Sequence, residues 1–314
     1  MFQNNPQKKP SGWQDSKIGR QRLVLADCLV WLAQAERNSI HAVVTDPPYG
    51  LIEFLPEEQR KLRIGRGGVW RIPPSFDGAN RRALPRFTTL SEEDRTRLFD
   101  FFFEWTKSLI PVLRPGAHVF VATNPLVSPV MSYALEKGGL ERRGEIVRLV
   151  RTFRGGDRPK GAEGAFEMVS TMPRSCWEPW ALFRKPIECR TVSENLKKWQ
   201  TGGLRRISKQ TPFLDVIQSS TTPDRERELA PHPSLKPQHF LRQLVRAALP
   251  VSRGTILDPF AGAGSTLGAC EHLRINGIGI EQDAEYFDIA KRAIPALALV
   301  KAETTLRQRV LPGL

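Results

Sequence analysis

Four consecutive residues, Asp46-Pro47-Pro48-Tyr49, combine groups that can activate an aromatic amine. The lone pair of such an amine is delocalised into its ring, so the nitrogen is a poor nucleophile until fixed acceptors bind its N–H groups. Asp46 supplies a carboxylate and Pro47 a backbone carbonyl, and the two prolines stiffen the turn that carries both. Tyr49 offers a flat face on which an extruded base can stack. A strand that ends in a Pro-Pro turn is the alternative, but the apolar run directly before the Asp favours the chemical interpretation.

A glycine-rich turn, Asp258 to Thr266 (DPFAGAGST), follows a second short apolar run. Gly262 and Gly264 let the backbone pass close to a ligand between a strand and a helix. Glu281 ends the next predicted strand about 20 residues beyond the first glycine, where an acid can bind ribose hydroxyls. The third glycine is Gly268, so the spacing is GxGxxxG rather than GxGxxG. With an Asp-Pro-Phe in front, this pattern favours S-adenosylmethionine (AdoMet) over NAD, and a tight structural turn is the alternative.

Alternating strands and helices must position these two turns. Apolar runs predict strands that end directly before each turn, and helical periodicity predicts helices between them. The predicted strands span residues 22–27, 41–45, 117–122, 146–153, 179–183, 255–257 and 277–280. The predicted helices span residues 28–36, 91–113, 126–136, 237–249, 265–273 and 284–294. This alternation predicts an α/β fold with a doubly wound, mostly parallel sheet.

Together, the two motifs resemble those of the amino-group DNA methyltransferases, with Asp46–Tyr49 as the catalytic DPPY motif and Phe260–Gly264 as an FxGxG-type AdoMet motif. Asp27-Cys28-Leu29 resembles the family's DCL segment near the cofactor adenine, and Leu113–Ala117 resembles its LKPGG turn. His232–Pro237 resembles its HPxxKP segment, which helps hold the cofactor's methionine end. The resemblance implies a Rossmann-like, AdoMet-dependent fold whose cofactor-binding residues are Asp27, Cys28, His232, Ser234, Lys236, Asp258, Phe260, Gly262, Gly264, Ser265, Thr266, Glu281 and Gln282.

The catalytic motif precedes the AdoMet motif, which is the order of the family's beta group and a circular permutation of the commoner arrangement. In the family's sheet, the strands that end at Asp46 and Asp258 are neighbours at the topological switch point, so both turns are expected to face one cleft. The implied organisation is a disordered tail (1–20), a catalytic half (21–183) with a basic loop (51–90), an inserted target-recognition segment (184–231), an AdoMet-binding half (232–300) and a C-terminal tail (301–314).

The DPPY form of the catalytic motif favours N6 of adenine as the methylated atom, whereas SPPY-type motifs favour N4 of cytosine, which is the close alternative. Gly50 replaces the polar residue that often follows the tyrosine, and this change removes none of the proposed catalytic atoms. A DNA-binding protein without catalysis is another alternative, against which the intact Asp46 and Glu281 argue. An RNA methyltransferase would more often have Asn in place of Asp46, and a nicotinamide oxidoreductase fits least.

Two long irregular segments and one glycine-rich loop are rich in basic residues. A base within a duplex cannot reach the cleft, so the target must be flipped out, and phosphate contacts can offset that cost. We therefore expect these segments to contact double-stranded DNA, with a solvated surface charge as the alternative for each single residue. Glu178 and Trp180 lie in a segment that resembles the family's base pocket, and a core position is the alternative for Trp180. The predicted DNA-binding residues are Arg66, Trp70, Arg71, Arg154, Arg158, Lys160, Lys197, Lys198, Arg205 and Arg206.

The composition agrees with a nucleic-acid partner. The 47 Lys and Arg against 33 Asp and Glu give a net charge of +14, which attracts polyanions, although basic soluble proteins are common. The four cysteines form no CxxC pair and the five histidines are scattered, so we expect reduced cysteines and no metal site. No apolar run reaches membrane-spanning length, so we expect a cytoplasmic protein. A homodimer and a cognate restriction endonuclease remain open as partners.

Overall fold

The computed structural model describes residues 13–48, 70–71, 84–85, 91–150, 156, 158–159, 161–232 and 234–301. Several residues that the sequence singles out lie outside these ranges, namely Tyr49, Arg66, Arg154, Lys160 and the predicted C-terminal tail beyond residue 301. Trp70 and Arg71 are described only as the backbone of the two-residue strand β4 (Trp70–Arg71), which pairs antiparallel with β5 (Leu84–Pro85).

The described residues form one large sheet with the strand order β1-β2-β11-β10-β3-β6-β8-β7-β9. Its central strands are parallel: β2 (Gln21–Leu25), β11 (Asn276–Glu281), β10 (Thr255–Asp258), β3 (Ile40–Thr45) and β6 (Leu113–Ala122). β8 (Trp177–Arg184) is antiparallel to both β6 and β7 (Glu141–Leu149), and the short β9 (Val216–Gln218) continues parallel to β7. The predicted doubly wound, mostly parallel sheet is therefore confirmed.

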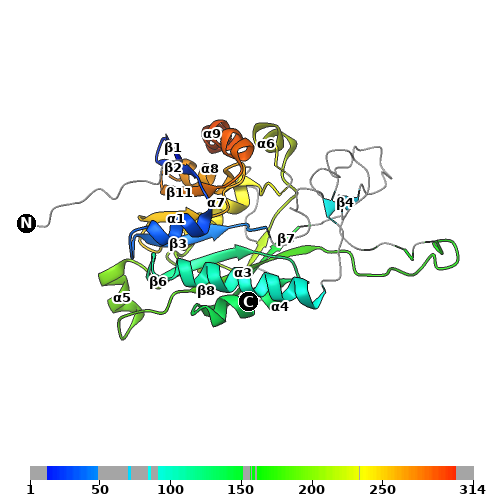
Figure 1. Ribbon diagram of the computed structural model, residues 1–314, viewed down its shortest axis with the longest axis horizontal. Helices are drawn as coiled ribbons and strands as arrows, with labels where there is room; N and C mark the ends of the chain where they lie inside the picture. The colour runs from blue at the N-terminus through cyan, green and yellow to red at the C-terminus, as the bar shows by residue number, and fades with distance from the viewer. Residues whose placement is uncertain are drawn as a thin grey trace, which may run out of the picture.

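Helices cover both faces of this sheet (Figure 1). One apolar core lies between the sheet and α1 (Cys28–Gln34), α3 (Glu92–Leu109) and α4 (Ser128–Lys137). The opposite face is covered by α7 (Gln238–Ala248), α8 (Ser265–His272) and α9 (Ala284–Leu299). Because both faces are covered, every residue of β3 is buried, which explains why its sequence, IHAVVT, is mostly apolar and does not alternate with exposed polar residues.

The carboxyl ends of β3 and β10 lie side by side at one edge of the sheet. From β3 the chain continues toward β6 on one side, and from β10 it continues toward β11 on the other. Neighbouring parallel strands whose connections diverge in this way leave a crevice at their carboxyl ends. The two turns that were singled out from the sequence, after Thr45 and after Leu257, both begin at this edge, which is called the catalytic edge below.

The predicted disordered tail (1–20) is wrong in its last part. Residues Gln14–Ile18 form β1, an antiparallel hairpin with β2, and the Arg22 guanidinium lies 2.8 Å from the Asp15 carboxylate. The polar composition of this strand resembles that of a tail because an edge strand needs little apolar area of its own. β1 closes the outer edge of the sheet beside β2.

The predicted target-recognition segment (184–231) is ordered rather than irregular. It contains α5 (Val192–Trp199), β9 and α6 (Asp224–Leu229), and β9 extends the large sheet. These elements are too short to give a periodic pattern in the sequence, which is why they were not predicted. In the part of the chain that is described, no helix is long and apolar enough to cross a membrane.

Candidate active site

A hydrogen bond joins the two sequence motifs at the catalytic edge. The Thr45 hydroxyl, at the end of β3, donates to Oδ1 of Asp258 at the end of β10, with an O···O distance of 2.7 Å. The Phe260 backbone N–H donates to the same oxygen at 3.2 Å. Asp258 is buried, and this burial raises the pKa of its carboxyl to about 6. Asp258 therefore fixes the start of the glycine-rich turn against the strand that carries Asp46.

Replacing Asp258 with asparagine should stabilise the protein at neutral pH. A carboxyl whose pKa is raised on folding lowers the free energy of unfolding as the pH rises from its unfolded value, 3.8, to its folded value, about 6. The amide oxygen of asparagine can still accept from Thr45 and Phe260 and carries no charge to bury. We expect a gain of up to about 3 kcal/mol at pH about 7.5 that disappears below pH about 4.

Urea unfolding of both proteins across this pH range measures the effect. If Asp258→Asn is less stable than the wild type at neutral pH, hydrogen bonds to the ionised carboxylate outweigh the cost of burying it.

Glu281 holds the glycine-rich turn through both of its carboxylate oxygens. The Gly262 N–H donates to Oε2 at 2.7 Å, and the Asp283 N–H donates to Oε1 at 2.8 Å. Gly262 and Gly264 adopt positive φ values of 50° and 81°, which favour glycine. The sequence predicts that Glu281 binds ribose hydroxyls, and a carboxylate has further lone pairs for them. The structure adds a second role, in which Glu281 shapes the turn itself.

His232 packs against the same turn from the loop before α7. A Cβ on Gly262 would lie 3.1 Å from Nε2 of His232, and the His232 ring meets the Tyr286 ring edge-on with centroids 4.5 Å apart. Nδ1 of His232 accepts the Ser234 N–H at 3.1 Å. Burial lowers the pKa of His232 to about 4, so its imidazole is neutral at physiological pH. His232 therefore acts as a flat, uncharged wall beside the turn.

The two motifs and the loop before α7 enclose a cleft with about 340 Å³ of atom-free space, part of which is open to solvent. Polar residues and apolar residues both line it, which suits a nucleoside that carries an amino-acid tail, such as AdoMet. Both Asp46 and the glycine-rich turn contribute to it. Eight of the predicted cofactor-binding residues line this cleft: His232, Ser234, Lys236, Asp258, Phe260, Gly262, Ser265 and Thr266.

The other predicted cofactor residues surround the cleft without lining it. Gly264 packs against α9, Glu281 lies behind the turn, and the exposed Gln282 follows Glu281. The Ala26 N–H donates to the Glu281 carbonyl at 2.9 Å, which brings Asp27 and Cys28 to the same edge of the sheet. The Asp27 carboxylate accepts two N–H groups as the N-cap of α1, whereas Cys28 is buried. Their predicted contact with the cofactor adenine stays a prediction.

Asp46 lies in the wall of the cleft with its two carboxylate oxygens in different environments. Oδ2 accepts a hydrogen bond from the Lys236 ammonium at 2.5 Å. Oδ1 is buried and has no hydrogen-bond partner among the described residues. Burial raises the pKa of Asp46, and the Lys236 charge opposes that rise. A buried acceptor without a partner is costly, so a hydrogen-bond donor on a bound molecule would satisfy Oδ1.

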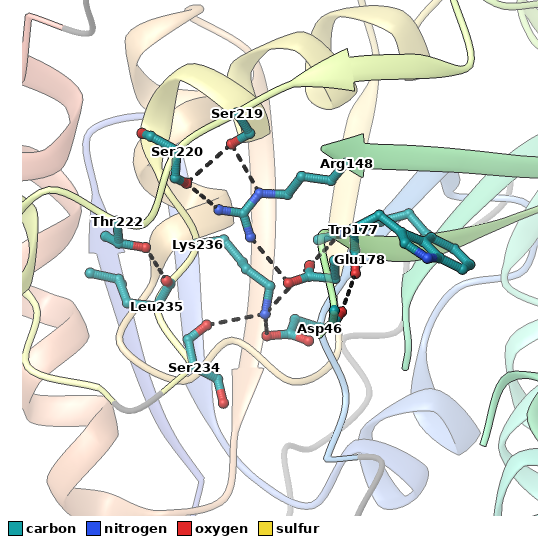
Figure 2. A network of polar contacts seen from close by, with 12 residues as sticks. Asp46, Arg148, Trp177, Glu178, Ser219, Ser220, Thr222, Ser234, Leu235 and Lys236 are labelled. Atoms are coloured by element: carbon teal, nitrogen blue, oxygen red, sulfur yellow. Dashed lines mark hydrogen bonds and ion pairs between the residues drawn. The ribbon is translucent and has the colours of Figure 1, made fainter. Parts of the chain in front are cut away.

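Lys236 also approaches a second carboxylate, Glu178 of β8, whose Oε1 lies 3.8 Å from its Nζ (Figure 2). Oε2 of Glu178 accepts from the Arg148 guanidinium of β7 at 3.1 Å. Trp180 is completely buried, packs edge-on against Phe240 and donates its ring N–H to Glu178 at 2.8 Å. Trp180 therefore fits both the predicted position in a pocket and the alternative position in the core, because it is a core residue that also lines the cleft. Sequence reasoning missed Arg148, since an arginine in a strand is normally exposed.

Four of the predicted DNA-binding residues lie near the ends of the strands that are opposite Asp46. Lys197 and Lys198 are in the last turn of α5, and the Trp199 carbonyl accepts from Arg114, which also binds the Asn38 carbonyl before β3. Arg205 and Arg206 contact the end of α7: the Arg205 N–H donates to the Ala247 carbonyl, and Arg246 donates to the Arg206 carbonyl. Since β3 spans six residues, these strand ends are about 20 Å from Asp46.

The structure thus places these four residues away from Asp46, and their predicted contact with DNA stays a prediction. By contrast, Arg158 is exposed in the long connection between β7 and β8. That connection leaves the sheet at the catalytic edge and projects from the body of the protein, at the end opposite α5 (Figure 1).

The fold and the cleft are those of an AdoMet-dependent methyltransferase, and comparison with known proteins identifies the family. Residues 40–292 match the N6_N4_Mtase family, described as DNA methylase. The type II methyltransferase M2.DpnII of Streptococcus pneumoniae is 34% identical over 277 residues, which cover 87% of this chain and 89% of the relative. M.HindIII of Haemophilus influenzae is 23% identical over 288 residues, which cover 84% and 92% of the two chains.

Solved structures share the fold. The M1.HpyAVI–SAM complex superposes with a TM-score of 0.54 at 16% identity, covering 87% of this chain and 98% of that chain. The PvuII DNA methyltransferase, described as cytosine-N4-specific, superposes with a TM-score of 0.54 at 12% identity, covering 90% and 87%. The chain belongs to the N6_N4_Mtase family of DNA methylases. The predicted beta-group, AdoMet-dependent DNA methyltransferase is thereby confirmed.

Proposed function

We propose that this protein methylates N6 of adenine in double-stranded DNA. The observation that carries the proposal is the buried Oδ1 of Asp46, an acceptor without a partner among the described residues in the wall of the cleft. An exocyclic amino group is a donor that fits such an acceptor. The aspartate at the first position of the DPPY motif supports adenine, because SPPY-type motifs favour cytosine. N4 of cytosine is the second candidate, since the PvuII enzyme shares this fold.

AdoMet, when bound, supplies a methyl group activated by its sulfonium. His232, Ser234 and the glycine-rich turn would hold it, since they line the cleft beside Asp46. Asp46 Oδ1 accepts one N–H of the target amine, and the Pro47 carbonyl accepts the other, which localises the nitrogen lone pair. As the new bond from nitrogen to carbon forms, the bond from that carbon to the donor sulfur would break and a neutral thioether, S-adenosylhomocysteine, would leave. The methylated nitrogen is then cationic and loses one proton, which Asp46 Oδ1 would accept. Stacking of the base on Tyr49 stays a prediction from the sequence.

DNA reaches this site from the catalytic edge in our proposal. The connection between β7 and β8, which carries the exposed Arg158, leaves the sheet at this edge. Its charges would bind phosphates around a flipped base. Lys197, Lys198, Arg205 and Arg206 are excluded from this surface by their position. The homodimer and the cognate restriction endonuclease stay predictions.

The modified base decides between the two candidate targets. We expect genomic DNA from a methylation-free bacterial host that expresses the protein to contain N6-methyladenine, measured by mass spectrometry of nucleosides. Sequencing that detects modified bases would give the recognition site. The Asp46→Ala protein, expressed at the same level, is the control for methylation by the host. N4-methylcytosine as the product would overturn the adenine assignment and retain the methyltransferase.

A further inference from the structure

Four charged side chains of alternating sign form a continuous chain that ends at the catalytic carboxylate (Figure 2). In order they are Arg148 of β7, Glu178 of β8, Lys236 before α7, and Asp46 after β3. Their side chains are only 5%, 18%, 7% and 16% exposed, respectively. Burial of a charge costs free energy that only a close opposite charge offsets. The alternating order of the four charges therefore matters, because it gives each of them such a partner.

The far end of this charge chain is rigid. Arg148 donates to the Ser219 hydroxyl at 3.0 Å and to the Ser220 carbonyl at 2.7 Å, in addition to Glu178. Its guanidinium also lies 5.2 Å from the centre of the Phe240 ring. The segment after β9, which was predicted to recognise the target sequence, thus holds Arg148 in place. Glu178 is fixed in turn, because one oxygen binds Arg148 and the other accepts the Trp180 N–H.

We propose that Lys236 is the counter-ion that keeps Asp46 ionised with Oδ1 turned to the target amine, and that Glu178 and Arg148 position this lysine. The proposal rests on the methyl transfer proposed above and deepens it. The family resemblance assigned Lys236 to the cofactor's methionine end, whereas its ammonium contacts Asp46 in this structure. The charge chain therefore connects Arg148 of β7, which was not predicted from the sequence, through Glu178 of β8 to the chemistry.

Electrostatics explains why Asp46 needs this support. Burial alone would favour the protonated acid, which cannot accept from an amine through the same oxygen as well as a carboxylate can. Lys236 and Arg148 favour the ionised form of Asp46, whereas Glu178 opposes it. Asp258 is a second buried carboxylate near Asp46, and each disfavours the charge of the other. Lys236 is the closest of the cations and has the largest effect.

The Lys236→Met variant tests the role of the lysine. Loss of this cation raises the pKa of Asp46, so the acidic limb of the pH profile of kcat should move up by about one pH unit or more. We expect kcat to fall about 100-fold at neutral pH, while the calorimetric Kd for AdoMet changes by less than about threefold. Weakened AdoMet binding with an unchanged kcat at saturating AdoMet would overturn the proposal and make Lys236 a cofactor ligand.

The Glu178→Gln variant tests the positioning role and keeps one of the two oxygen acceptors, because the amide NH2 group replaces the other carboxylate oxygen. Glutamine can still accept the Trp180 N–H but no longer holds Lys236 by charge. We expect kcat to fall about tenfold, with the acidic limb moving to lower pH because an anion near Asp46 is gone. The limb should thus move in opposite directions in Lys236→Met and Glu178→Gln, which a general loss of structure cannot produce.

The same two strands offer a matched control. Glu141 of β7 and Arg184 of β8 form an ion pair of 2.6 Å at the other end of the hairpin, away from Asp46. Glu141→Gln should leave kcat and the limb unchanged. Equal losses in Glu141→Gln and Glu178→Gln would overturn the positioning role.

Two further results separate this inference from the proposed function. The limb belongs to Asp46, so it should persist in Asp258→Asn and move to lower pH, because a carboxylate near Asp46 is gone. A wild type that methylates cytosine would end the adenine proposal and leave this one intact, because both targets are exocyclic amines. A wild type that methylates DNA without any limb shift in the two variants would end this inference alone.

Discussion

The Asp46→Ala protein should be inactive in methyl transfer yet bind AdoMet almost as the wild type does. The carboxylate is the proposed acceptor for the target amine and for its released proton, and loss of such a group typically lowers rates by about 10²–10⁴-fold. We expect a loss of at least about 10³-fold, because the polarising contact and the base are one group. Calorimetric titration with AdoMet and transfer of labelled methyl groups to DNA measure the two properties separately.

Folding of Asp46→Ala should be preserved, because the Glu178 carboxylate still lies 3.8 Å from the Lys236 ammonium. Asp46→Asn is the matched variant, since its amide keeps an oxygen acceptor of the same shape without the charge. It should retain more activity than the alanine variant. Loss of AdoMet binding together with activity in Asp46→Ala, at unchanged circular dichroism, would show that Asp46 organises the cofactor cleft.

The sequence was sufficient to predict that Asp46 and the glycine-rich turn meet. Each follows an apolar strand, and the family resemblance implies that these two parallel strands are neighbours, so their carboxyl ends bring the two motifs together. The hydrogen bond from Thr45 to Asp258 shows that the two motifs meet as expected. Residues that precede or follow a strand in this way can be placed without knowledge of side-chain packing.

The partners of Asp46 could not be predicted in the same way. Arg148 lies near the end of β7, 102 residues from Asp46 along the chain, and only the register of β7 against β8 sets it opposite Glu178. Register follows from packing over the whole sheet, and nothing near Arg148 in the sequence specifies it. For the same reason, the basic residues of α5 were assigned to DNA, because their charge is visible in the sequence and their position at the far ends of the strands is not.

The Gly264→Ala protein should lose both stability and affinity for AdoMet. Gly264 has a φ of 81°, and a Cβ there would lie 2.6 Å from Cγ1 of Ile294 in α9. The left-handed conformation costs an alanine about 1–2 kcal/mol, and the overlap with α9 adds about 1–3 kcal/mol unless the turn moves away. Movement would displace Gly262 and Ala263, which line the cleft. We therefore expect the free energy of unfolding to fall by about 3 kcal/mol and the Kd for AdoMet to rise at least about tenfold.

Gly164→Ala is the matched control, because a Cβ at this exposed glycine meets no atom within 4 Å and the residue has no positive φ. It should change the free energy of unfolding by less than about 0.5 kcal/mol and leave AdoMet binding as it is. Urea unfolding and calorimetric titration of the two variants, side by side, separate a general cost of Gly-to-Ala exchange from the specific one. Wild-type affinity in a destabilised Gly264→Ala protein would mean that the cofactor cleft tolerates movement of the turn. In that case the glycine serves the packing of α8 on α9, and the position of the turn depends on Glu281, whose carboxylate accepts from the Gly262 N–H.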